Sequence, residues 1–187
     1  MVWSVSADAP DIRELLHQLD ATEQDAHSLV AKLPKDAGSR RPSSDRWSVA
    51  ECFDHLTKAN TAYLSEMKPA AAQARARGRY RTGPATPGFI GAWFARSQEP
   101  PVKQRLKSPR MIVPQPQMSL AEAFPAFLAS HGEVRTFVTT HADLDLAHVR
   151  FPNPFVWGVR FSLASALYII AAHERRHLWQ ARQIWPS

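Results

Sequence analysis

The last helical pattern of the sequence, over residues 161 to 184, carries two histidines on its apolar stripe. His173 and His177 are four residues apart, so on a helix they lie on one face, one turn from each other. The same face holds Leu163, Ala166, Ile170, Gln180 and Ile184. The two imidazoles therefore point toward a core and not toward solvent. Such a pair is either half of a metal site or two buried polar groups that need partners.

Three further helical patterns precede this one, over residues 10–33, 49–67 and 120–140. The first opens with Pro10, which is favourable at a helix start, and ends before Pro34. The other two begin with capping boxes, Ser48 with Glu51 and Ser119 with Glu122. The second pattern extends beyond residue 67 as far as Ala76, with a break in the helix that we expect near Pro69.

Between the second and third patterns, residues 78 to 118 form a long connection. It contains seven of the fifteen prolines of the chain. Residues 89–95 are compatible with a short helix, and Trp93 and Phe94 indicate that part of the connection packs on the body. A turn-rich aromatic segment over residues 151–158 is expected to close one end of the core. The sequence thus predicts an all-α fold, a four-helix bundle with a long, Pro-rich and basic connection between helices 2 and 3.

The size and composition of the chain fit one globular domain over residues 1–187, with 44% hydrophobic and 21% charged residues. A single cysteine, Cys52, excludes an internal disulfide framework and fits a reducing compartment. Residues 1–8 lack the features of a secretory signal, and the apolar run 163–172 is too short for a membrane span. We therefore expect a cytoplasmic protein with no membrane partner.

The basic character of the chain belongs to one segment. The chain has a net charge of +6. Residues 75–110 hold nine lysines and arginines against one glutamate, a net charge of +8, so the rest carries −2. No DNA- or RNA-binding motif and no aromatic stacking platform accompanies these charges. The segment is therefore interpreted as a solvated basic excursion, in preference to a nucleic-acid surface.

A third histidine on an inward face is the natural partner of His173 and His177. His55 lies on the stripe of the second pattern between small residues, which leaves room for its ring between helices. His131, on the stripe of the third pattern, is a rival that could join or replace His55. His17 lies at the edge of the first stripe and is interpreted as a surface or half-buried histidine.

Residues 173–177 also match H-E-x-x-H, the zinc-binding helix of metalloproteases, in which the glutamate is the general base. The familiar families with this motif take their third ligand from downstream. Only ten residues follow His177, and none of them is His, Asp or Glu. A third ligand must therefore come from upstream, which argues against a protease site.

A different resemblance covers nearly the whole chain. Two segments, Trp47-Ser-Val-Ala-Glu-Cys-Phe-Asp-His55-Leu and His173-Glu-Arg-Arg-His177-Leu-Trp-Gln180, resemble the DinB-like (YfiT-like) superfamily. The order of elements and the Asn153-Pro-Phe approach to the last helix are also similar. The resemblance implies a four-helix bundle in which His55, His173 and His177 hold one divalent metal ion.

The resemblance also implies two kinds of activity. Three imidazoles suit zinc, nickel or iron and leave at least one coordination position open. Such an ion can activate water, as in a hydrolase, or a low-molecular-weight thiol, as in a thiol transferase. The alternative is a non-enzymatic binding or stress-associated protein with a structural or vestigial metal site. The expected partner is a small molecule such as a thiol, and the resemblance also implies a homodimer, which the family often forms.

Without the resemblance, three core histidines satisfied by hydrogen bonds and water would explain the pattern as well as a metal does. Glu174, one residue off the histidine face, is expected to pair with a neighbouring arginine; the alternatives are that it orients a water molecule or contacts the surroundings of the metal ligands. Arg175, Arg176 and Gln180 are interpreted as structural or as contacts of the metal ligands. The sequence assigns no catalytic or substrate-binding residue.

Overall fold

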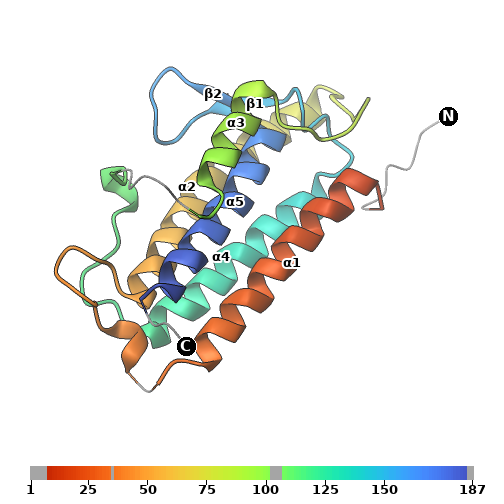
Figure 1. Ribbon diagram of the computed structural model, residues 1–187. Helices are drawn as coiled ribbons and strands as arrows, with labels where there is room; N and C mark the ends of the chain where they lie inside the picture. Colours follow the sequence, from red (N-terminus) through yellow and green to blue (C-terminus); the bar gives the residue numbers. More distant parts are fainter. Residues whose placement is uncertain (1–7, 35, 102–106, 185–187) are drawn as a thin grey trace.

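The computed structural model describes residues 8–34, 36–101 and 107–184, and within them the chain forms five α-helices and one small hairpin (Figure 1). The helices are α1 (Pro10–Ala31), α2 (Val49–Ala76), α3 (Phe89–Gln98), α4 (Leu120–Thr140) and α5 (Leu163–Arg182). Two 3₁₀ turns, η1 (Ala37–Ser39) and η2 (Arg110–Ile112), and the strands β1 (Arg150–Pro152) and β2 (Arg160–Ser162) complete them. The helical bundle is confirmed, but a fifth helix and the hairpin were not part of the predicted fold class.

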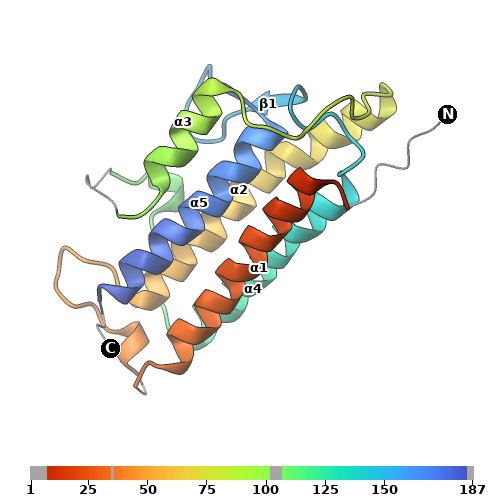
Figure 2. The same ribbon diagram turned by 45° about the vertical axis from the view of Figure 1, so that its right-hand side comes forward.

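Four of the helices form the bundle, in which α1 and α2 each contact both α4 and α5 (Figures 1 and 2). Ion pairs between side chains show in which direction the helices run relative to one another. Arg75, near the end of α2, binds Asp143 just beyond the end of α4, so α2 and α4 run parallel. Asp25 in α1 pairs with Arg182 at the end of α5, so these two helices also run parallel. The chain must therefore cross the full length of the bundle between α2 and α4.

The second helix begins as predicted and continues beyond the predicted break. The hydroxyl of Ser48 accepts a hydrogen bond from the Glu51 amide, and the Glu51 carboxylate accepts one from the Ser48 amide. Pro69 lies inside α2, which continues to Ala76, so the expected break at Pro69 is wrong. The residues around the proline, including Met67 and Ala71, are buried in the core, and this packing holds the helix together across the missing backbone hydrogen bond.

The connection between α2 and α4 is more ordered than its prolines suggest. Its middle forms α3, which packs along α5 (Figure 2). A Cβ atom at Gly91 would lie 2.2 Å from the Ser165 hydroxyl oxygen, so the two helices approach too closely for any other residue. Just beyond α3, the carboxylate of Glu99 accepts hydrogen bonds from Arg175 of α5. The predicted irregular excursion is therefore, in part, a fifth helix fixed to the bundle.

The bundle has two apolar clusters with a polar layer between them. One cluster lies toward the hairpin and includes Leu15, Met67 and Leu167. The other lies toward the start of α2 and includes Phe53 and Phe127. Buried polar residues occupy the levels between the two clusters: Asn60, Ser130, His131, Glu174 and His177. No helix of the described residues is long and apolar enough to cross a membrane.

Candidate metal centre

Three histidines from two helices meet in the polar layer. His55 comes from α2, and His173 and His177 come from successive turns of α5. Each offers one ring nitrogen, and these three nitrogens all lie within 4.8 Å of one another. His55 and His177 are 2% and 6% exposed, and His173 is partly exposed. The predicted convergence of the three imidazoles is therefore confirmed.

The spacing of two of the three ring nitrogens fits a shared cation. Two ligands at 2.0–2.1 Å from a tetrahedral zinc ion lie roughly 3.3 Å from each other. The Nε2 atoms of His55 and His173 are 3.1 Å apart. In addition, Nδ1 of His177 is buried and has no hydrogen-bond partner among the described residues. A buried ring nitrogen needs a partner, so within the part of the chain that the structure describes His177 is one hydrogen bond short.

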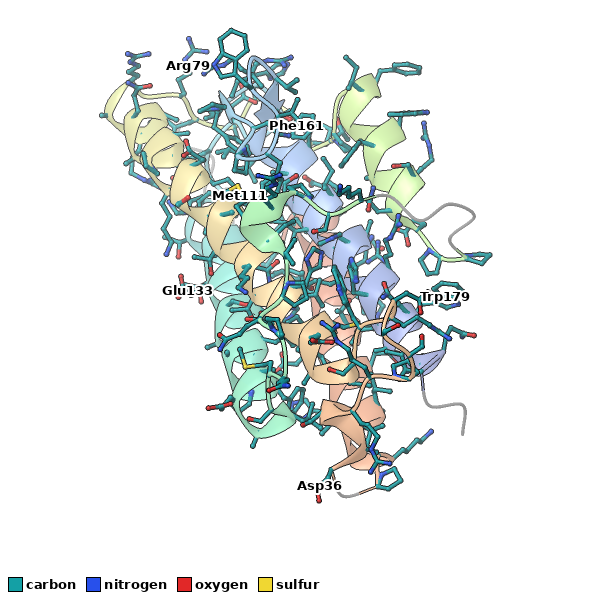
Figure 3. The ribbon with its side chains drawn as sticks, turned by 90° about the vertical axis from the view of Figure 1, so that its left-hand side faces the viewer. Asp36, Arg79, Met111, Glu133, Phe161 and Trp179 are labelled. Carbon is teal, nitrogen blue, oxygen red and sulfur yellow. The ribbon has the colours of Figure 1, made fainter. Side chains whose placement is uncertain are left out.

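The 3₁₀ turn η2 determines which nitrogen of His55 faces the cluster. The backbone carbonyl of Ile112 lies 2.6 Å from His55 Nδ1, and a carbonyl can only accept a hydrogen bond. Nδ1 must therefore carry the proton, which leaves the lone pair of Nε2 pointing toward His173. Figure 3 shows η2, marked by Met111, lying against α2. A carbonyl in this position is the usual orienting partner of a metal-binding histidine.

Ile112 was not identified from the sequence, and no residue pattern marks a backbone carbonyl as a partner for a side chain. The turn lies in the segment that the sequence assigns to an irregular excursion. Lys58 of α2 helps to hold the segment in place, because its ammonium group donates to the Val113 carbonyl and to Asp54. The Asp54 carboxylate also accepts a hydrogen bond from the Gln115 amide.

The protein keeps the three rings neutral. Burial lowers the pKa of His55 to about 4, although the Ile112 hydrogen bond and the charge of Asp54 act in the opposite direction. Burial also holds the pKa values of His173 and His177 well below the usual range, and the neighbouring histidines and Arg176 lower them further. At neutral pH each ring therefore has a nitrogen lone pair to offer, as a metal site requires.

An indole ring covers one side of the cluster. Trp47, the residue before the Ser48 cap, stacks on His177 with ring centroids 5.9 Å apart and lies 4.9 Å from the ring of His55. The loop that carries it is anchored by Arg41, whose guanidinium binds both carboxylate oxygens of Glu51. The capping box thus positions the aromatic side chain as well as the start of α2.

A second polar group lies next to the cluster and links three helices. Glu174 of α5 is fully buried, and its carboxylate accepts hydrogen bonds from Asn60 of α2 at 2.8 Å and from His131 of α4 at 2.9 Å. His131 therefore neither joins nor replaces His55. The expected pairing of Glu174 with an arginine is wrong, because Arg175 binds Glu99 instead. Asn60 of α2 and His131 of α4 both face Glu174 and supply its hydrogen bonds, whereas Arg175 is directed to Glu99.

Two of the remaining polar candidates, Arg175 and Arg176, have structural roles. Arg175 binds Gln18 of α1 as well as Glu99, and Arg176 lies 3.4 Å from Gln98 of α3. The two arginines thus connect α5 to its neighbours, as interpreted from the sequence. His17 is exposed on α1, as expected.

An open groove of about 550 Å³ lies elsewhere on the bundle. It runs along α4 beside α2 and is lined by Lys68, Ala129, Gly132, Glu133, Thr136, Phe137, Thr140 and His141. None of these residues belongs to the histidine cluster. The groove therefore does not lead to the candidate metal centre.

Comparison with known proteins agrees with the geometry. The sequence profile of the DinB superfamily matches residues 18–181, which include all three histidines and all five helices except the start of α1 and the last residue of α5. Neither a search of curated proteins nor a search of solved structures finds a significant match. The profile thus covers most of the chain, and the histidine cluster lies within the matched residues. The chain belongs to the DinB superfamily.

Proposed function

We propose that His55, His173 and His177 hold one divalent metal ion and that the protein uses it to activate a small molecule, as a hydrolase or a thiol transferase. The observation that carries the proposal is the pair of Nε2 atoms 3.1 Å apart, with His177 beside them. Imidazole ligands suit zinc, nickel and iron. A three-histidine ion with an open position lowers the pKa of a water molecule or thiol that binds to it.

The residues around the cluster support this use. Ile112 keeps the proton of His55 on Nδ1, so that Nε2 is available without a change of tautomer. Burial keeps all three rings neutral. Trp47 covers the side formed by His55 and His177 and excludes water there, while His173 keeps some exposure. A small substrate would therefore approach on the side of His173.

One observation favours a second candidate function, a structural metal in a non-enzymatic binding protein. His55 and His177 are almost fully buried, which restricts access to an ion held between them. A structural ion needs no access, whereas a catalytic ion needs an open coordination position. The two candidates therefore agree on metal binding and differ on turnover.

Turnover measured on metal-loaded protein separates the two candidates. Zinc-, nickel- and iron-loaded samples would be incubated with activated esters, and with a low-molecular-weight thiol plus an electrophile. We expect turnover in one series, its loss in His55→Ala and its retention in His17→Ala, with helical circular dichroism unchanged. A protein that binds one ion per chain but turns over neither substrate class supports the structural ion.

A further inference from the structure

The end of the bundle away from the histidine cluster exposes several large apolar side chains. Three segments lie at this end: the end of α2 and the start of α3 on opposite sides, and the hairpin of β1 and β2 between them (Figures 1 and 3). Trp157 in the turn is 100% exposed, and Phe89 and Ile90 at the start of α3 are 84% and 70% exposed. Tyr80 and Val156 are each about half exposed. We call these five residues the apolar group of the bundle end.

The apolar group is held outward by ordered structure. Gly91 and Ala95 form the face of α3 that packs toward α5, so Phe89 and Ile90 remain on the outer part of the helix. In the hairpin turn, the Asn153 side chain accepts hydrogen bonds from the backbone amides of residues 155 and 156. Phe155 packs edge-on against Tyr63, with ring centroids 5.1 Å apart. The next turn residues, and Trp157 above all, are therefore presented to solvent.

Basic side chains come from two of the same segments, the end of α2 and the hairpin. Three carboxylates of this end, Asp11, Asp143 and Asp145, are already bound by Arg81, Arg75 and His148. A further set of arginines is exposed, and within residues 8–34, 36–101 and 107–184 none of them takes part in an ion pair: Arg77, Arg79, Arg150 and Arg160. Figure 3 shows Arg79 at this end of the molecule. The bundle end thus combines protruding aromatic side chains with uncompensated positive charge.

We propose that this end of the bundle docks on the surface of an anionic phospholipid bilayer. Aromatic side chains are favoured at the boundary between headgroups and acyl chains, and arginines bind the negative headgroups. Trp157, Phe89 and Ile90 would enter the boundary while the four arginines remain among the phosphates. The sequence predicts no membrane partner because no segment spans a bilayer, but peripheral docking requires no span.

Three other partners fit the bundle end less well. A second copy of the chain would place the same unpaired arginines opposite each other, and like charges repel. A nucleic acid would need aromatic faces in a groove that follows the backbone, whereas Trp157 protrudes from the tip of a turn. An acidic protein would match the charge, but a protein interface is built around a pocket that receives its aromatic anchors. Side chains that protrude from the bundle end need no matching pocket in a fluid lipid surface, because they can insert between its lipids.

Sedimentation with lipid vesicles tests the proposal. The full chain would be mixed with phosphatidylglycerol vesicles or with phosphatidylcholine vesicles, at low salt and at 0.5 M NaCl, a concentration chosen because it screens exposed charges. We expect binding to the anionic vesicles alone, and its loss at the higher salt. Each arginine in such a contact contributes about fivefold to the partition coefficient. Arg77→Ser together with Arg79→Ser should therefore weaken binding by about 25-fold.

The apolar contribution has its own variants and control. Trp157→Ser should weaken binding to the anionic vesicles by about tenfold, and Trp157→Phe should keep most of it. Arg40→Ser removes an exposed arginine near η1, at the other end of the bundle, and should leave binding unchanged. Helical circular dichroism and zinc binding of every variant show whether the fold and the histidine cluster are intact.

Several outcomes would overturn the proposal. One is no sedimentation with phosphatidylglycerol vesicles at low salt, and another is equal binding by Trp157→Ser, the double arginine variant and the unaltered chain. Self-association that is lost in Trp157→Ser would assign the surface to a second copy of the chain. Binding of an acidic polypeptide in preference to vesicles, with loss in the same variants, would assign it to a protein. None of these results depends on whether the histidine cluster binds metal.

Discussion

The four histidines near the centre of the bundle differ in the direction in which the protein shifts their pKa values. The pKa of His55 is lowered to about 4 by burial, and those of His173 and His177 are also lowered. Burial acts on His131 too, but the hydrogen bond and the negative charge of Glu174 outweigh it and raise its pKa. Acid therefore disfavours the folded state through the first three rings, while His131 has the opposite effect. Neutral rings face one another in the cluster, and beside it the ring whose pKa is raised faces a carboxylate.

The first prediction concerns the stability of the metal-free protein in weak acid. An unfolded histidine takes up a proton near pH 6.5, whereas folded His55 does so only near pH 4. The free energy of unfolding should therefore fall as the pH falls from 6.5 toward 4. For His55 alone the loss is about 2 kcal/mol between pH 7 and pH 5. Urea unfolding at pH 7, 6 and 5 measures it.

The matched variants for this titration are His55→Ala and His17→Ala, both free of metal. His17 is exposed, so its replacement should leave the pH dependence unchanged. His55→Ala should flatten the dependence, since one of the groups responsible is gone. The interpretation is contradicted if His55→Ala and the unaltered chain lose stability in parallel over this pH range.

The second prediction concerns Glu174, whose carboxylate accepts hydrogen bonds from both Asn60 and His131. Glu174→Gln replaces one acceptor oxygen by an NH₂ group, which would face a donor and leave it unsatisfied. We expect a loss of about 2 kcal/mol in the free energy of unfolding, measured in urea. Glu133→Gln is the control, because Glu133 forms an exposed pair with Lys68 and should change stability by less than about 1 kcal/mol. Equal effects would show that the buried network contributes little.

At the level of elements, the close approach of α3 and α5 gives the third prediction. Gly91→Ala would place a Cβ atom 2.2 Å from the Ser165 hydroxyl oxygen and 2.5 Å from the Ser165 Cβ. The two helices must then separate, and we expect destabilisation by about 1–3 kcal/mol. Ser165→Gly in the same chain removes both contacting atoms and should recover part of the loss. Thermal unfolding and limited proteolysis near α3 measure the effect.

Gly132→Ala is the control for the same substitution inside a helix. Gly132 lies in α4, and a Cβ atom there would meet nothing within 4 Å. Alanine is the better helix former, so the protein should become more stable by about 0.5–1 kcal/mol. If Gly91→Ala also stabilises the protein, α3 does not depend on close contact with α5.

The helices were predictable to different degrees, for reasons that the structure shows. The third predicted helix has the observed bounds of α4, because a capping box starts it and a sustained apolar stripe follows. Pro69 misled the prediction, because the packing that keeps α2 continuous involves residues far away in the sequence. The hairpin of β1 and β2 has three residues in each strand, too few for an alternating pattern.

Across the whole molecule, the length of the connection between α2 and α4 follows from the direction of the helices. A 28-residue helix is about 42 Å long at 1.5 Å per residue, and α4 starts beside the beginning of α2. The chain must cover that distance before α4 begins. Composition identified the connection, but only the three-dimensional arrangement shows why it is long and why it passes His55 at Ile112.

The candidate site was predictable because its residues obey helical spacing. His173 and His177 share a face by their four-residue separation, and the family resemblance selected His55 over His131. The contacts that complete the site come from the rest of the fold. The Ile112 carbonyl, the stacking of Trp47 on His177 and the pairing of Glu174 with His131 depend on which helices face each other, and a one-dimensional pattern does not contain that information.

The central claim is that one ion is held by three histidines, and zinc titration of the metal-free protein tests it most directly. Calorimetric titration followed by elemental analysis of the desalted complex should give one zinc ion per chain. His55→Ala, His173→Ala and His177→Ala should each lose this binding, whereas His17→Ala should keep it. Full zinc binding by His173→Ala with unchanged stoichiometry, or no zinc binding by the intact chain, would contradict the claim.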